Sequence, residues 1–158
     1  MTTTPQDFRE AVDKVCADFN WVTHAFTRDD EFAVLCELEG DEHFEQILWI
    51  LNTQRNTFRC LVTSRMEVPP GKTSTLLELC ARINDGLGFG CAEFSFADQQ
   101  VVFRDGADLQ GQGLEDIVSV TSARLFSMAM RYGPAVNRVL AGDAPAEAVA
   151  RVEANSKQ

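Results

Sequence analysis

The amino-acid sequence predicts an α+β fold, in which helices pack against an antiparallel β-sheet. Two observations lead to this class. Between residues 21 and 66, four segments rich in β-branched and aromatic residues alternate with short stretches of turn composition. Before and after this region, apolar residues recur at the three- and four-residue spacing of helices. With 158 residues, the chain 1–158 is expected to form a single domain.

The first expected element is a helix that begins at Pro5, because the fixed φ of proline suits the first position of a helix. Its buried face is predicted from the helical spacing of four apolar residues. These residues are Phe8, Val12, Val15 and Phe19.

Four consecutive strands are expected next, at 21–26, 31–38, 43–51 and 57–66. The stretches between them, TRDD, EGD and NTQRN, have good turn compositions. Strands joined by such short connections pair antiparallel, so the region predicts a four-stranded meander. The apolar run from Ile47 to Leu51 indicates that the third strand is central and covered on both faces.

The stretch VPPGKTST (68–75) ends in Gly-Lys-Thr, as the phosphate-binding loops of many nucleotide hydrolases do. Such a loop needs a glycine five positions before Gly71, where this chain has Met66. Its prolines also have no N–H to donate to a phosphate. We therefore interpret the stretch as a strand-to-helix turn in which Thr73 or Ser74 caps the next helix.

Helical spacing covers the region 67–90, and Gly86 is expected to end that helix in the left-handed conformation. A β-hairpin is expected after it, with strands at 91–96 and 101–105 around the turn ADQQ.

A long helix is expected from about 114 to 140. It should be interrupted at Gly133-Pro134, because proline lacks the N–H of the helix ladder and its ring kinks or breaks the helix. The remaining segment, 143–158, is expected to form a short helix and a frayed tail, so the core should span about 5–142.

The run 58–106 resembles the YbjN family of small bacterial proteins. In that family a strand ends in a V-P-P turn, a helix leaves through an N-x-G-L-x-x-G motif, and a hairpin follows. The closing sequence RYGPAVNRVLAGDAPAEAVA (131–150) also resembles the last helix and the ending of the family, so the resemblance covers about 5–150. The exit motif is matched here by Asn84, Gly86, Leu87 and Gly90.

This resemblance implies a fold similar to that of the type III secretion chaperones, which are small acidic dimers that hold partly unfolded client proteins. Members of the family are also labelled as sensory transduction or stress regulators. The resemblance supplies no catalytic residues and no cofactor.

The chain is acidic: 14 basic side chains stand against 24 acidic ones, a formal charge of −10. Such a field repels nucleic-acid phosphates and anionic lipid heads and favours basic or amphipathic partners. We therefore expect neither nucleic acid nor a membrane as a partner. The N-terminus lacks the basic start and apolar run of a signal peptide, and the longest apolar stretch, 47–51, is too short for a bilayer. A cytoplasmic protein is expected.

Five cysteines are spread singly along the chain, with no C-x-x-C pair. Their neighbours are apolar, so we interpret them as buried thiols that act as small hydrophobic side chains. A catalytic or metal-bound thiolate would need basic or histidine-rich surroundings. The cysteines are Cys16, Cys36, Cys60, Cys80 and Cys91.

Two histidines, His24 and His43, fall in separate expected strands, and His43 lies among acidic residues. This group offers oxygen ligands for a cation, but its spacing matches no metal motif, so a solvated acidic turn is the favoured interpretation. We expect no metal site, no cofactor and no enzymatic activity. The acidic residues concerned are Glu39, Asp41, Glu42 and Glu45.

The stretch RLFSMAMRYG (124–133) is apolar on two faces of its expected helix. Both faces packing inside the chain is the favoured interpretation, and dimer packing or partner binding is the alternative, since methionine suits adaptable surfaces. Trp21 and Trp49 are interpreted as core or sheet-face residues rather than ligand platforms. The candidate residues of an interface are Phe126, Met128, Met130 and Tyr132.

These expectations favour a non-catalytic protein-binding module, chaperone-like or regulatory, that acts as a homodimer and binds a protein client or regulatory partner. The alternative is a regulatory domain that senses a small ligand in a pocket between the sheet and the long helix. An enzyme is a third reading, which no acid, base or metal constellation supports.

Overall fold

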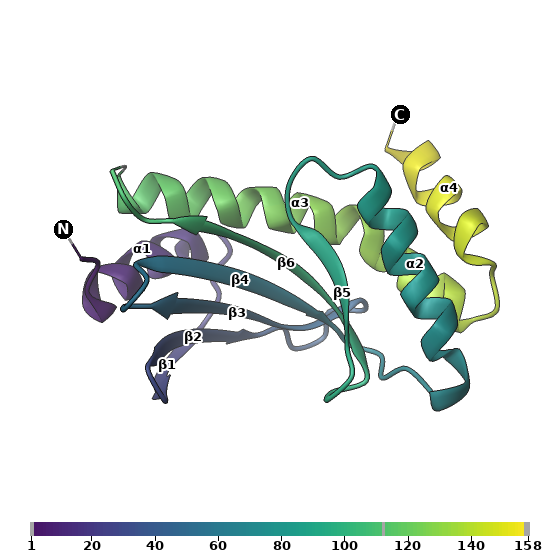
Figure 1. Ribbon diagram of the computed structural model, residues 1–158, viewed down its shortest axis with the longest axis horizontal. Coiled ribbons are helices and arrows are strands. Elements are labelled where there is room, and N and C mark those ends of the chain that lie inside the picture. Colours follow the sequence, from purple (N-terminus) through teal and green to yellow (C-terminus); the bar gives the residue numbers. More distant parts are fainter. Residues whose placement is uncertain (1, 112, 157–158) are drawn as a thin grey trace.

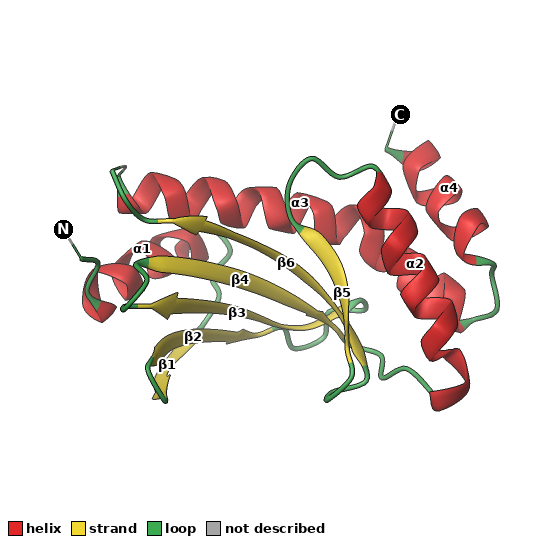
Figure 2. Ribbon diagram, in the orientation of Figure 1, coloured by secondary structure: helices red, strands yellow, loops and turns green. Residues whose placement is uncertain are grey.

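The structure, a computed structural model, describes residues 2–111 and 113–156. Within these residues, three α-helices pack on one face of an antiparallel six-stranded sheet, and a fourth, α4, packs on two of these helices, α2 and α3 (Figure 2). The predicted α+β class is confirmed. The helices are α1 (Pro5–Ala17), α2 (Thr73–Asp85), α3 (Leu114–Leu140) and α4 (Pro145–Asn155). The strands are β1 (Thr23–Arg28), β2 (Glu31–Glu37), β3 (Phe44–Asn52), β4 (Thr57–Ser64), β5 (Cys91–Ser95) and β6 (Gln100–Asp108).

The strand order is β1-β2-β3-β4-β6-β5, and every neighbouring pair is antiparallel. The first four strands form the expected meander, and the β5–β6 hairpin joins it through β6 (Figure 1). Helix α3 runs along the sheet, while α2 and α4 lie side by side at the end next to β5. None of the helices in the described ranges combines the length and the apolar composition that a bilayer crossing requires.

Strand β3 lies in the interior of the sheet, but helices pack on only one of its faces. Trp49 is fully buried against α3, and its indole Nε1 donates a hydrogen bond to Ser122 Oγ at 2.9 Å. Leu48 and Ile50 alternate with Trp49 and so point to the opposite face. All helix contacts of the described sheet come from the Trp49 side, with α1 on β1 to β3, α3 on β4 and β6, and α2 on β5. The expectation that both faces of this strand are covered was therefore right only in part: the second face carries no helix in the described residues, although Ile50 there is 8% exposed.

The two predicted ends of α2 were also wrong in their details. The cap residue at its start is Lys72, and no side chain caps it. A short 3₁₀ turn, Pro70–Lys72, runs directly into α2, and the Thr73 hydroxyl donates back to the Pro70 carbonyl at 3.2 Å. At the other end, Gly86 is the C-cap of α2, as expected, but its φ is −104°, outside the predicted left-handed region.

The α2–β5 connection is held by two residues of the exit motif. The Asn84 side chain accepts a hydrogen bond from the Ala92 N–H at 2.7 Å and donates one to the Ala92 carbonyl at 2.9 Å. Gly90 has a φ of +68°, and a Cβ there would lie 2.8 Å from the Arg104 carbonyl oxygen. These two residues therefore build the fold, because they tie the end of α2 to the hairpin.

Helix α3 continues through Gly133 and Pro134, so the predicted break at this point was wrong. Pro134 removes one hydrogen bond from the ladder, but Ala135 and Val136 beyond it are fully buried. Gly133 lets the ring of Phe44 lie directly against the helix backbone, since a Cβ at this position would come within 2.4 Å of the ring. Packing on the sheet therefore holds the last part of the helix in place.

The core continues into α4, beyond residue 142, because Ala148 and Val152 are buried. The cysteines are free thiols; four are buried and Cys91 is half-buried, which fits their interpretation as small hydrophobic side chains. Burial, with smaller effects from neighbouring charges, raises the pKa of Cys16 to about 12. Burial likewise raises the pKa of Cys80 to about 12. Both thiols are therefore protonated at neutral pH.

The replacement Gly133→Ala is expected to lower the free energy of unfolding by about 1–3 kcal/mol, because the new methyl group displaces the buried Phe44 ring. The helix propensity of alanine offsets only part of this loss. The matched control is Gly86→Ala, where a Cβ meets nothing within 4 Å. This control should change the free energy of unfolding by less than about 0.5 kcal/mol. Urea denaturation checks both, and equal effects would contradict the close-packing argument.

Alkaline pH is expected to destabilise the protein through its buried thiols. An unfolded thiol titrates near pH 9, while Cys16 and Cys80 in the folded chain hold their protons to about pH 12. The folded state thus binds more protons in this window, and the free energy of unfolding falls as pH rises, by at most about 1.4 kcal/mol per pH unit for each thiol. Chemical denaturation between pH 8 and pH 11 measures the slope. The double variant Cys16→Ala/Cys80→Ala should show a shallower slope, and an unchanged slope would refute the assignment.

Candidate functional site: a groove between the sheet and helix α3

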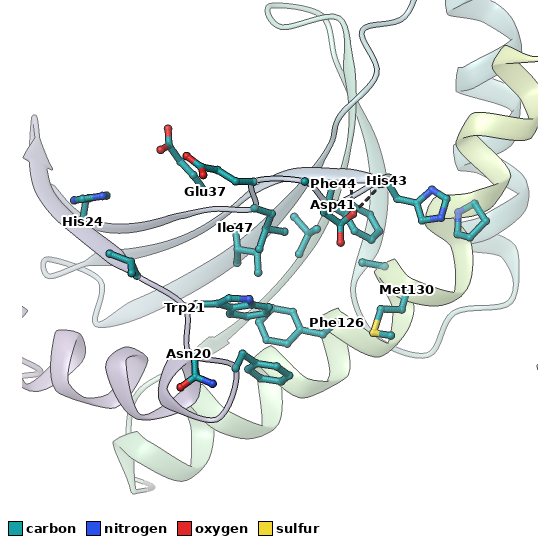
Figure 3. A pocket seen from close by; sticks show the side chains of 18 residues that line it. Asn20, Trp21, His24, Glu37, Asp41, His43, Phe44, Ile47, Phe126 and Met130 are labelled. Atoms are coloured by element: carbon teal, nitrogen blue, oxygen red, sulfur yellow. Dashed lines mark hydrogen bonds between the residues drawn. The ribbon is translucent and has the colours of Figure 1, made fainter.

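A groove of about 950 Å³ opens between α3, the helix-facing side of β3 and β4, and two connections of the chain. One connection joins α1 to β1 and contributes Phe19 to Val22. The other joins β2 to β3 and contributes residues 38–41 and His43. Figure 3 shows Trp21 and Phe126 side by side inside the groove, with Met130 farther along α3 on the same side.

The floor of the groove is aromatic. The rings of Phe19 and Trp21 are stacked at a centroid distance of 4.4 Å, and the edge of Phe126 meets Trp21 at 5.6 Å. Asn20 between the first two has a φ of +55°, which asparagine tolerates better than most residues. This turn directly after α1 brings both flanking rings to one side. Phe19 remains 51% exposed, although it belongs to the cluster.

One face of α3 forms a wall of the groove, through Phe126, Met130 and Pro134 at successive four-residue steps. Met130 is 73% exposed, so this flexible apolar side chain is available to a ligand. Because Pro134 has no N–H, the Met130 carbonyl lacks the donor that a helix normally provides four residues later. The wall is therefore apolar in its side chains, and the helix ladder lacks one hydrogen bond within it.

The rim at the β2–β3 connection is acidic and well ordered by hydrogen bonds. The Asp41 carboxylate accepts hydrogen bonds from the backbone N–H groups of His43 and Phe44, both at 2.8 Å. The Arg65 guanidinium donates to the backbone carbonyls of Asp41 and Phe44 at 2.6 and 2.8 Å. Among the described lining residues three are acidic, and none is lysine or arginine; the acidic ones are Glu37, Glu39 and Asp41.

The two histidines sit at the margins of the groove. A ring nitrogen of His43 lies 2.9 Å from the Asn137 amide nitrogen, and this contact joins the acidic turn to α3. His24 alternates with the inward residues of β1 and lies at the edge strand. Within residues 2–111 and 113–156, no group of three or more His, Cys, Asp or Glu side chains is placed to hold a metal ion.

The four interface candidates from the sequence separate into two pairs. Met128 and Tyr132 are 8% and 3% exposed and belong to the core of the chain, where the Tyr132 hydroxyl donates to Glu153 of α4 at 3.0 Å. Phe126 and Met130 line the groove. Trp49 is a core residue, as expected.

Sequence reasoning missed the contribution of Phe19 and Trp21 to the groove. Phe19 was assigned to the buried face of the first helix, but that helix ends at Ala17. The available signal was the tripeptide Phe19-Asn20-Trp21, since asparagine between two aromatic residues at a helix end is compatible with a turn that exposes both rings.

Comparison with known proteins gives a family for the chain. A family model described as "YbjN: Putative bacterial sensory transduction regulator" matches residues 9–135. Searches of curated proteins and of solved structures found no match. The matched region runs from α1 into the part of α3 that lines the groove and includes the whole sheet. On this match, which covers more than half of its length, the chain belongs to the YbjN family.

Proposed function

We propose that this protein is a non-catalytic regulatory module that binds a short protein segment carrying apolar side chains next to basic ones. The observation that carries the proposal is the groove, in which a partly exposed aromatic floor adjoins three carboxylates and, among the described lining residues, no lysine or arginine. The family description, a sensory transduction regulator, is compatible with a module that acts by binding.

The apolar part of the groove supplies the affinity. Phe19 and Met130 are large apolar side chains that remain mostly exposed, at 51% and 73%. Covering such a side chain stabilises a complex by up to about 1.5–3 kcal/mol. Trp21 and Phe126 give the segment rigid rings to pack against, and Met130 can adjust to different apolar side chains.

The acidic part of the groove selects basic segments over acidic ones. Glu37 and Glu39 are exposed at the rim, and the whole chain carries a formal charge of −10. This field attracts basic segments during encounter and opposes acidic ones. A chaperone-like role, in which the groove holds part of an unfolded client, and a regulatory role use the same surface.

The free thiols accord with a reducing, cytoplasmic location.

A small-molecule ligand is the second candidate, and the size of the groove favours it. A volume of about 950 Å³ lies within the range of pockets that hold small ligands. In that case a metabolite would raise the melting temperature of the protein, and basic apolar peptides would not bind. A metabolite panel in a thermal-shift assay separates this candidate from the peptide.

The binding proposal predicts that a peptide alternating leucine and lysine changes the fluorescence of Trp21, whereas the same peptide with glutamate for lysine does not. The replacement Met130→Lys removes an apolar contact and adds a positive charge, so it should weaken peptide binding by about tenfold or more. Fluorescence titration and calorimetry measure the dissociation constant.

The matched control is Val120→Lys, an exposed position on the same helix that does not line the groove. It adds the same charge to α3 and should leave the peptide affinity within about twofold. Equal losses in both variants would show a general charge effect, and equal binding of the lysine and glutamate peptides would remove the charge-based selection from the proposal.

A further inference from the structure

The outer face of the sheet, which lies opposite the helices, carries an apolar row at its centre. Leu35, Leu48 and Leu61 stand directly opposite one another on β2, β3 and β4, so their side chains form a continuous row on one face. All three remain partly exposed to solvent. His24 on β1 and Arg104 on β6 stand at the two ends of this row, and the nearest apolar residues on those strands, Phe26 and Val102, lie diagonal to it, opposite Ala33 and Thr63. An antiparallel sheet with one solvated face usually carries polar residues on that face. The apolar row therefore indicates a surface that another molecule buries.

The charges around this row nearly balance, in contrast to the rest of the chain. By the strand registers, three arginines and five acidic residues border the outer face, a net −2 of the formal −10. Both guanidinium N–H groups of Arg59 donate to the Glu31 carboxylate at 2.9 Å, and Arg104 pairs with Glu93. The arginines are Arg28, Arg59 and Arg104; the acidic residues are Glu31, Glu37, Glu45 at the β-bulge, Glu93 and Asp108.

We infer that the outer face of the sheet is the surface on which a second copy of this chain docks. A basic partner gains little here, because two of the carboxylates already hold arginines. Two acidic copies repel each other over most of their surface, and this nearly neutral face is where that repulsion is smallest. A two-fold axis places the same surface against itself, so the apolar row meets an apolar row and mixed charges meet mixed charges.

The size of the face suits a weak dimer. Six strands at about 4.8 Å spacing and about seven residues of strand length give roughly 29 Å by 23 Å. This is on the order of 650 Å² for each copy, or about 1,300 Å² in total, near the lower end of specific interfaces. Two sheets packed face to face interdigitate their side chains, as the leucines of the two rows would. The aromatic floor of the groove lies on the helix side, so the dimer leaves it open, and Glu37 at the end of β2 borders both surfaces.

Sedimentation velocity of the full chain over a range of concentrations tests the inference. The protein should pass from monomer to dimer in the micromolar range, and Leu48→Lys should raise the dimer dissociation constant by at least about tenfold. The matched control is Leu77→Lys, the same change at an exposed leucine on α2 far from this face; it should leave the constant within about twofold. Should Leu48→Lys fail to fold, the double variant Leu48→Thr/Leu61→Thr makes the same test with residues that suit strands.

Hydroxyl-radical footprinting of the unmodified chain gives an independent measurement. Leu35, Leu48 and Leu61 should become protected as the concentration rises, while Met130 in the groove should not. Raising the salt from about 0.05 M to about 0.5 M should leave the dimer equally tight or tighter, because salt screens the repulsion between two acidic copies. A monomer at all concentrations, or a dimer lost in Met130→Lys and retained in Leu48→Lys, would overturn the inference.

Discussion

The packing of one long helix, α3, across one face of the sheet is the constraint on which the rest of the structure depends. Its buried side contacts β4 and β6 and also meets α1, α2 and α4. The hydrogen bond from Trp49 to Ser122 lies inside this contact, where neither polar group can reach water. Burial of this face offsets the missing hydrogen bond at Pro134, so the helix can extend as far as α4.

The groove is a consequence of the same packing. Near Gly133 the helix comes so close to β3 that the Phe44 ring touches its backbone, while farther from this contact Phe126 and Met130 face open space. The chain fills part of that space with the Phe19 and Trp21 rings and bounds it with the turn that Arg65 holds in place. The aromatic floor and the acidic turn are therefore held in place by packing and hydrogen bonds, which lowers the entropic cost of binding.

The one-sided arrangement gives the two faces of the sheet different tasks. The apolar side chains and thiols of the inner face are buried in the hydrophobic core. The groove at its margin presents acidic charge, and the outer face presents leucines among paired charges. In the functions proposed above, a basic segment and a second copy of the chain therefore recognise different surfaces, and one can bind without displacing the other.

The sequence by itself determined the α+β class, the strand meander and the positions of most helices, because these follow from local periodicity and turn composition. The order of its motifs also pointed to the family. It did not determine that the helix continues through Gly133 and Pro134, because this depends on packing against Phe44, which is distant in the chain. Nor did it determine how α2 begins, because this depends on the 3₁₀ turn that precedes the helix. Nor did it separate Met130 from Met128, because helical spacing shows which residues share a face but not what that face meets. Only the tertiary structure decided that Phe19, Trp21 and Phe126 come together and that one face of the sheet stays open, because both depend on where the helices dock.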